Sequence, residues 1–338
     1  MVRLVLASLV ILGHAWPLTG NDAQPSMEFV SGIAVNAFFV ASGYLIAGSR
    51  IRASFFRFLW RRALRIYPAF IVCLLVLATG FGPLAALIEG RAYQWDSAIS
   101  YVFQNSLLRI QQRGIDGTLT AVPYEIAWNG SLWTLYFEFI AYVLLGLLLT
   151  GAWIQKRAAI IVPVAFVLVV LARFAALGPL DVSTSFYLSG LRLAGYFLAG
   201  AVLYFLASRI ILRPSYTLLA LVAYLGLWMV DGADLFGQLP LAYLVLSIGA
   251  IRYTGFATKH DVSYGVYIYA FPVQQTLVLL GTASWGIAAN SVLTLVITFA
   301  LAWASWTYLE RPMLAFKDLG SVSRLGRFGK PPEFESPR

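Results

Sequence analysis

Long apolar stretches alternate with short polar segments along this chain of 338 residues. Ten of the stretches are long enough to cross a hydrocarbon layer of about 30 Å as helices. Their approximate limits are 2–18, 29–48, 64–83, 131–153, 158–177, 186–207, 214–231, 238–254, 263–281 and 286–309. Sustained apolar runs of this length predict an all-α fold, a polytopic bundle of about ten transmembrane helices.

The longest polar segment, residues 84–130, contains a weaker periodic pattern. Apolar side chains recur there at helical spacing, at Ile99, Val102, Phe103, Leu107 and Ile110. This pattern predicts an amphipathic helix that lies on or dips into one membrane surface. Three tryptophans are expected to anchor the loop at the membrane interface: Trp95, Trp128 and Trp133.

Composition supports a membrane protein. Hydrophobic residues make up 60% of the chain and charged residues 12%, and the mean hydropathy is +0.78. A soluble domain has about twice that charged fraction. The net charge of +9 does not indicate nucleic-acid binding, because the basic residues lie between the apolar runs, where they set topology.

The basic residues also predict the orientation. Arg50, Arg52, Arg57, Arg61, Arg62 and Arg65 follow the second apolar run, and further Lys and Arg residues follow the fourth, sixth, eighth and tenth runs. The alternate loops contain only Arg91, Arg109 and Arg113, among many acidic residues. By the positive-inside rule, we expect both termini in the cytoplasm and a location in the cytoplasmic (inner) membrane.

Domain organisation is predicted to be simple. Residues 1–317 form the membrane domain, and residues 318–338, a segment with Pro, Gly, Ser and Arg, form a short cytoplasmic tail that we expect to be disordered. No cleavable signal peptide is evident. Cys73 is the single cysteine, so neither a disulfide within the chain nor a cysteine metal site is predicted.

Arg3 and His14 are the most informative polar residues. Eleven positions along a helix advance about 1100°, so the two side chains face nearly the same way, about 16 Å apart along the axis. Ionisable residues within an apolar helix indicate a polar cavity or a reaction site. The alternatives are that His14 only packs between helices and that Arg3 is an anchor that snorkels to the surface.

Glu138 is an acidic residue in the middle of an apolar run. We expect it at a depth comparable to that of His14, where a carboxylate would orient the imidazole and stabilise its protonated form. A hydrogen bond between helices with only a structural role is the alternative.

Arg62 and Arg65 are three residues apart and share a helix face at the cytoplasmic end of their apolar run. A pair of guanidiniums suits a ligand rich in phosphate. Binding of anionic membrane lipid, or a role in topology alone, explains such a pair equally well. Residues 38–45 include small residues, among them Ser42 and Gly43, that permit close helix packing.

These motifs together resemble the membrane-bound acyltransferase 3 family. They are Arg3 and His14 with ten residues between them, Phe38 to Ile46, Arg62-x-x-Arg65-Ile-Tyr-Pro, Asn129-Gly-Ser-Leu-Trp-Thr-Leu leading to Glu138, Asp261-Val-Ser-Tyr-Gly-Val-Tyr267 and Glu310-Arg-Pro. They occur in family order from residue 3 to residue 312. The chain departs from the family in two places: almost nothing precedes the motif arginine, and the late Tyr-x-x-His-x-Pro pattern has Ala270 in place of the histidine.

The resemblance implies a membrane enzyme that transfers an acyl group, usually acetyl, from cytoplasmic acyl-CoA to a hydroxyl of a surface or exported glycan. It implies His14 as the catalytic residue, with Arg3 as its motif partner, Arg62 and Arg65 as the arginine pair, and Glu138 as the family's acidic position. Ser42, Gly43, Trp133 and Tyr267 are expected to contact substrate or to support the site. Acetyl-CoA is expected as a co-substrate whose phosphates are held by Arg3, Arg62 and Arg65, without a permanent cofactor or metal.

The partners that follow are an acyl-CoA donor, a glycan or lipid-linked saccharide acceptor and membrane lipid, with no nucleic acid. Two other functions remain open at this stage. A proton-coupled secondary transporter could use Glu138 and His14, although the internal repeats expected of many transporters are not evident. A carrier without catalytic activity is the other, and it would not require the spacing of Arg3 and His14.

Overall fold

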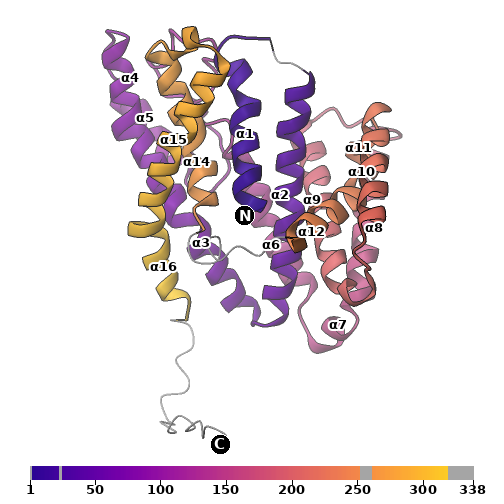
Figure 1. The fold of residues 1–338 in the computed structure, drawn as a ribbon. Coiled ribbons are helices and arrows are strands. Elements are labelled where there is room, and N and C mark those ends of the chain that lie inside the picture. Colours follow the sequence, from indigo (N-terminus) through magenta and orange to yellow (C-terminus); the bar gives the residue numbers. More distant parts are fainter. Residues whose placement is uncertain (1, 23–24, 252–260, 319–338) are drawn as a thin grey trace, which may run out of the picture.

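A computed structural model of the protein describes residues 2–22, 25–251 and 261–318 (Figure 1). Within these ranges every regular element is a helix, which confirms the all-α prediction. The α-helices are α1 (Val2–Leu18), α2 (Pro25–Ile51), α3 (Phe55–Val76), α4 (Gly82–Ile88), α5 (Trp95–Asn105), α6 (Trp133–Leu148), α7 (Ala152–Lys156), α8 (Ala158–Leu177), α9 (Ser185–Phe205), α10 (Pro214–Met229), α11 (Ala233–Phe236), α12 (Gln238–Ile251), α14 (Ser263–Leu279), α15 (Ile287–Ser305) and α16 (Arg311–Ala315). The tail predicted beyond residue 318 lies outside the described residues.

Five helical segments among the described residues are long and apolar enough to cross a membrane: Phe29–Ile51, Phe55–Ile88, Ala158–Leu177, Ser185–Phe205 and Ile287–Ala315. Single turns of π-helix extend two of them, at Leu77–Phe81 and Trp306–Glu310. Four shorter apolar helices accompany them, namely α1, α6, α10 and α12. At 1.5 Å per residue, a 17-residue helix such as α1 is about 26 Å long, somewhat less than the hydrocarbon thickness. These helices are those of a membrane protein.

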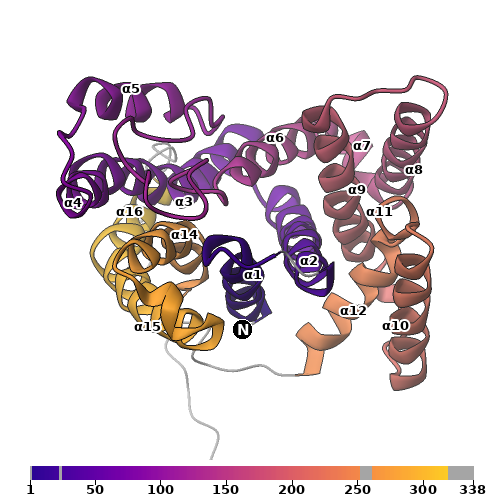
Figure 2. The ribbon, with the colours of Figure 1, turned by 90° about the horizontal axis from the view of Figure 1, so that it is seen from above.

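Helix α14 lies in the interior of the bundle, beside α1, α3 and α15 (Figure 2). Its residues are buried on all sides from Ser263 to Val278, apart from the partly exposed Tyr267. A helix that is apolar around its whole circumference is typical of such a position. Helix α1 packs between α14 and α2, so it also has neighbours on both sides.

Helices α2 and α9 approach each other more closely than side chains would allow. A β-carbon on Gly43 would lie 1.8 Å from the Phe197 carbonyl oxygen, and one on Gly200 would lie 2.0 Å from the Val40 carbonyl oxygen. Glycine on each helix therefore faces backbone on the other. The small residues that the sequence predicts for helix packing serve that purpose at Gly43.

The segment between α5 and α6 folds back over the end of α14. The Gln275 amide donates hydrogen bonds to the carbonyls of Tyr124 and Ala127, at 2.8 and 2.9 Å. Trp128 is fully buried, and its indole N–H donates to the Thr118 hydroxyl at 2.8 Å. The prediction that Trp128 anchors the loop at the membrane interface is therefore wrong, because this ring packs inside the folded loop.

The amphipathic helix predicted in this region exists as α5. Its apolar residues Trp95, Ile99 and Phe103 are exposed, whereas Tyr101 and Asn105 are buried against the bundle. The helix ends at Asn105, so the last two members of the predicted apolar row, Leu107 and Ile110, lie beyond it.

Candidate functional site

A cavity of about 440 Å³ opens where the first turn of α1 meets α2, α3 and α6. The side chains that line it include five that are basic (Arg3, Arg61, Arg62, Arg65 and Lys317) and two that are acidic (Glu138 and Asp261). The structure thus brings together Arg3, the arginine pair and Glu138, which lie far apart in the sequence. A strongly positive cavity of this size favours an anionic ligand.

Arg65 is held from two sides. One terminal nitrogen donates to Asp261 Oδ2 at 2.6 Å and the other to Glu310 Oε2 at 2.8 Å. The guanidinium also lies over the rings of Tyr264 and Trp306, at 5.7 and 5.3 Å from their centroids. Glu310 is 2% exposed and accepts a further hydrogen bond from Ser305. Arg65 therefore ties α3 to α14 and α16, and its donors are largely engaged.

Asp261 links Arg65 to Arg3, whose guanidinium lies 3.6 Å from the same carboxylate oxygen. Burial favours the neutral acid, but the charges of Arg3 and Arg65, together with hydrogen bonds from Ser263, outweigh it and lower the pKa of Asp261 to about 2. The carboxylate is therefore ionised at neutral pH and fixes the start of α1 against the start of α14.

Arg62 differs from its neighbour in the pair. Its side chain lines the cavity, and its Nε is buried without a hydrogen-bond partner among the described residues. A buried donor that lacks a partner costs free energy unless a ligand satisfies it. The two arginines that sequence spacing treats as equivalent thus have different environments, and Arg62 is the one left available to an anion.

Glu138 lies at the inner edge of this cavity, and its Oε1 accepts two hydrogen bonds. Ser42 donates at 2.8 Å, and Tyr142, one turn further along α6, donates a second. Ser42 and Tyr142 also pair with each other at 2.9 Å. No hydrogen bond or ion pair joins Glu138 to His14 within the described residues, so the expected contact between carboxylate and imidazole is absent there. Glu138 instead lines both this cavity and a smaller one together with Arg3, and His14 lines neither.

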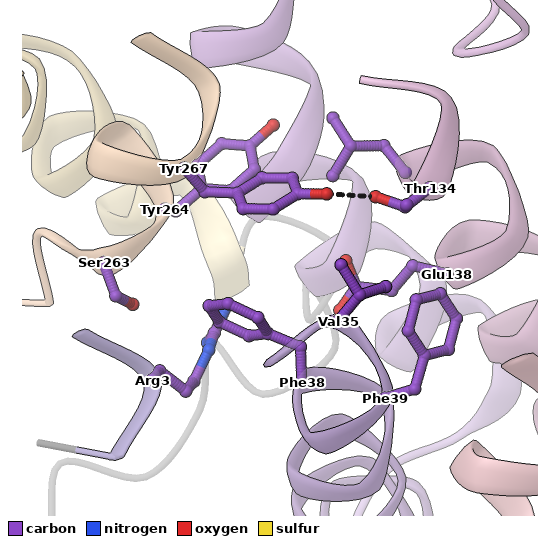
Figure 3. A pocket seen from close by; sticks show the side chains of 10 residues that line it. Arg3, Val35, Phe38, Phe39, Thr134, Glu138, Ser263, Tyr264 and Tyr267 are labelled. Carbon is purple, nitrogen blue, oxygen red and sulfur yellow. Dashed lines mark hydrogen bonds between the residues drawn. The ribbon is translucent and has the colours of Figure 1, made fainter. Parts of the chain in front are cut away.

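A smaller cavity, about 30 Å³, continues from Arg3 and Glu138 between α2, α6 and α14 (Figure 3). This volume accommodates about one water molecule. At its far side the Tyr267 and Thr134 hydroxyls lie 2.6 Å apart, and Tyr267 donates to the Ser131 carbonyl at 2.9 Å. The ring of Phe38 packs edge-on against Tyr267, 5.6 Å between centroids. Tyr267, predicted as a motif residue, closes this cavity.

His14, on α1, contacts Phe271, which follows Tyr267 by about one turn on α14. Its partly exposed ring packs edge-on against Phe271, 5.1 Å between centroids, and neither cavity is lined by it. Phe271 in turn requires glycine at position 130, where a β-carbon would lie 2.6 Å from the ring. Trp133, the other motif residue on α6, contacts Phe137 and faces outward.

Sequence reasoning missed the roles of Tyr142, Asp261 and Glu310. Tyr142 follows Glu138 by four residues, the spacing of neighbours on one helix face, so a local signal existed for it. The two carboxylates lie 196 and 245 residues from Arg65, and no local pattern connects them.

Comparison with known proteins matches the sequence of this chain to one family. Residues 1–308 match the family model of an acyltransferase domain. An O-acetyl transferase of Shigella phage Sf6 is 30% identical over 332 residues, which cover 92% of this chain and 94% of the phage protein. Nodulation protein 10 of Rhizobium leguminosarum bv. viciae is 26% identical over 353 residues, 94% of this chain and 93% of that protein. No solved structure matches. The family model covers nearly the whole chain, and the chain therefore belongs to the acyltransferase 3 family.

Proposed function

We propose that this protein transfers an acetyl group from cytoplasmic acetyl-CoA to a hydroxyl of a surface or exported glycan. The proposed topology has ten spans, with both termini in the cytoplasm and the bundle in the cytoplasmic membrane. The similarity to a phage O-acetyl transferase supports the reaction. The excess of Lys and Arg on one side of the apolar runs supports the topology.

One observation carries the proposal: a series of contacts connects the positive cavity to His14. Arg3 and Glu138 line both the positive cavity and the small one, and Thr134 and Tyr267 line the small one. Phe271, four residues after Tyr267 on α14, touches His14. Arg3 and His14 lie on the same helix, about 16 Å apart along its axis. An extended thioester arm that enters at Arg3 would follow α1 to the imidazole.

Arg62 is the residue that we expect to bind the phosphates of the donor, together with Arg3 and Lys317. Its buried Nε without a partner is the feature that fits an anionic group. Arg65 is expected to act as a positioning residue, since its ion pairs with Asp261 and Glu310 hold the wall of the cavity.

His14 is the proposed general base. Its neutral imidazole removes the proton of the acceptor hydroxyl as that oxygen attacks the thioester carbonyl. The carbon–oxygen bond forms, the carbon–sulfur bond breaks, and the proton on His14 passes to the departing sulfur. Transient acylation of His14 itself is the second route, and both use the same residue. We assign Glu138 the role of positioning the Arg3 guanidinium, in place of the expected role of orienting the His14 ring.

The arm cannot pass in the conformation described above, because the small cavity holds about one water molecule. Donor binding is therefore expected to displace Tyr267 from Thr134 and to move the Phe38 ring. Side-chain and helix movements of this kind accompany substrate entry in many enzymes.

Inside-out membrane vesicles supplied with radiolabelled acetyl-CoA test the proposal. The unsubstituted chain should deposit label on glycan, and His14→Gln should deposit none at an equal protein level. Arg62→Ala should raise the apparent KM for acetyl-CoA about tenfold or more, as expected when a charged contact is lost. The matched control is Arg57→Ala, which removes an exposed arginine from the same helix and should leave the KM unchanged.

Normal labelling by His14→Gln would refute the role of His14. The same assay separates the transporter alternative, because a transporter moves its substrate without depositing label.

A further inference from the structure

A third cavity lies on the opposite side of α2 from His14. It measures about 370 Å³, within the range of about 300–1,000 Å³ typical of small-ligand sites. Helices α2, α9, α10 and α11 enclose it, together with the turn at Asp231. We propose that this cavity binds an uncharged sugar unit of the glycan acceptor, at a distance from the unit that is acylated. The identity of the ligand as part of the acceptor rests on the function proposed above.

The cavity lies at the same depth as His14. Gly13, the residue before His14, packs against Ser31 so closely that a β-carbon would lie 2.4 Å from the Ser31 side chain. The next residues along α2, Gly32 and Ile33, line the cavity. Helix α2 stands between α1 and the α9–α12 group (Figure 2). A single sugar could not touch both sites, whereas a polymer that crosses α2 could.

One wall of the cavity is aromatic. The rings of Phe29 and Trp228 lie 4.2 Å apart between centroids, and Tyr224 continues the wall 6.3 Å from Phe29. Trp228 is 40% exposed, so its ring is accessible to a ligand. The C–H face of a pyranose is apolar and flat, so an aromatic surface of this kind suits it, while the hydroxyl rim requires hydrogen-bonding partners.

Four planar polar side chains also line the cavity and can provide those partners: Asn36, Arg192, Asp231 and Asp234. Asn36 is 3% exposed, and its Oδ1 has no hydrogen-bond partner among the described residues. A buried amide oxygen that faces a cavity without a partner indicates a ligand that donates a hydrogen bond. Asp231 holds a left-handed backbone conformation, with φ +55°, which directs the turn after α10.

Buried residues behind the cavity hold this turn in place. Arg173 and Arg192 lie 3.5 and 3.6 Å from Asp234, and Tyr196 donates to the Ala233 carbonyl at 2.9 Å. The Gln238 amide donates to the Asp234 carbonyl at 3.2 Å. The polar groups are therefore preorganised, which lowers the entropy cost of binding a hydroxylated ligand.

The balance of charge around the cavity favours an uncharged ligand. Arg192 lines the cavity with Asp231 and Asp234, and Arg173 behind the lining also pairs with Asp234, so the two signs of charge balance locally. A phosphate or an anionic lipid headgroup would meet the Asp231 and Asp234 carboxylates, and a cation would meet the Arg192 guanidinium. A polyol gains hydrogen bonds from both signs of charge without a net electrostatic cost.

The test measures binding of saccharide in the absence of any acyl donor. The full chain is placed in lipid nanodiscs and titrated into fluorescently labelled oligosaccharides, which are released by mild acid from the surface polysaccharide of the producing cells. Fluorescence anisotropy then gives a Kd. Trp228→Ala and Asp231→Asn should each raise this Kd about tenfold or more, as expected for an anchor residue of a binding site.

Asp231→Asn keeps the shape of the side chain, and asparagine accepts the left-handed conformation. This variant therefore still tests the proposal if Trp228→Ala fails to fold. The matched control is Trp285→Ala, which removes a tryptophan that is 65% exposed, far from the cavity, and should leave the Kd unchanged.

An unchanged Kd in both cavity variants would overturn the proposal, as would competition by choline or by phosphatidylglycerol vesicles. The outcome is separate from that of the transfer assay. If the variants lose saccharide binding and the unsubstituted chain transfers no acetyl group, the acyltransferase function alone is overturned. Transfer together with an unchanged Kd would overturn the sugar site alone.

Discussion

Ser42 and Glu138 form a hydrogen bond of 2.8 Å across the interface of α2 and α6, 96 residues apart in sequence. Each lies in a motif that resembles the acyltransferase 3 family, so two motifs meet in one contact. The Tyr142 hydroxyl donates to the same carboxylate oxygen and lies 2.9 Å from the Ser42 oxygen. A carboxylate among apolar helices is tolerated when hydrogen bonds satisfy it, and here two hydroxyls do so.

Tyr142→Phe is expected to lower the free energy of unfolding. The substitution removes one donor to the carboxylate, which costs about 1 kcal/mol. Thermal unfolding in detergent measures this loss as a lower Tm. Tyr187→Phe removes a hydroxyl from a tyrosine that is 64% exposed on α9 and should leave the Tm unchanged. Equal Tm values for the two variants would show that the bond to Glu138 contributes nothing.

Arg65→Ala should destabilise the protein more strongly. It leaves Glu310, 2% exposed, without its cationic partner, and breaking a buried pair costs about 3–5 kcal/mol. The double variant Arg65→Ala with Glu310→Gln removes the uncompensated charge and should recover part of the folded yield in size-exclusion chromatography. If the double variant is no more stable than the single one, the ion pair is not the source of the loss.

The lowered pKa of Asp261 predicts a specific pH dependence of the stability of the protein. Its pKa is lowered from an ordinary value of 3.8 to about 2, so the folded state favours the ionised form. Its contribution is fully present above the ordinary value and is lost as the pH falls toward about 2. The side chain is 38% exposed, so solvent screens part of the effect.

The difference in Tm between the unsubstituted chain and Asp261→Asn should therefore be constant from pH 7 to about pH 5 and shrink below the ordinary pKa. Asp96→Asn, at an exposed position on α5, is the matched control and should follow the unsubstituted chain throughout. A difference that grows on acidification would contradict the role of Asp261.

Helices were the feature most accessible from the sequence, because long apolar runs have few other ways to satisfy their backbone. α1 and α8 lie at the predicted limits, 2–18 and 158–177. Which face of each helix packs against which neighbour was harder to predict. α14 is buried on all sides, so its composition contains no amphipathic pattern from which a contact could be read. The contact of Phe271 with His14 depends on that packing alone.

Part of the cavity lining was predictable from the sequence, but the pairings of its residues were not. Arg3, Arg62, Arg65 and Glu138 do line one cavity. Their partners come from distant segments, as Asp261 does for both Arg3 and Arg65, and spacing along the chain cannot specify such contacts. The same limit explains the error at Trp128, whose partner Thr118 belongs to an irregular loop without a periodic pattern.

Gly43→Ala should prevent α2 and α9 from packing. The added β-carbon would lie 1.8 Å from the Phe197 carbonyl oxygen, and both clashing groups belong to rigid helices. The expected loss is about 1–3 kcal/mol or more. Gly226→Ala on α10 meets nothing within 4 Å and should raise stability by about 1 kcal/mol, because alanine favours helix. An unchanged Tm for Gly43→Ala would contradict this prediction, because it would mean that the two helices lie farther apart than described.

Cysteine labelling tests the donor cavity and the topology together. Cys73 is the only cysteine in the chain and is 0% exposed, so it should not react with a charged, membrane-impermeant thiol reagent. Ser49 lines the large cavity. Ser49→Cys should be labelled in inside-out vesicles but not in right-side-out vesicles, and added CoA should protect it.

Ser284→Cys is the control at the other end of the bundle, because α15 runs from residue 287 to the segment that contains Glu310 beside Arg65. Ser284 is exposed and should be labelled in right-side-out vesicles, with no protection by CoA. Labelling of both positions from the same side would refute the proposed topology. Labelling of Ser49→Cys from the cytoplasmic side without protection by CoA would separate the two conclusions, since the orientation would stand and the large cavity would no longer be the donor site.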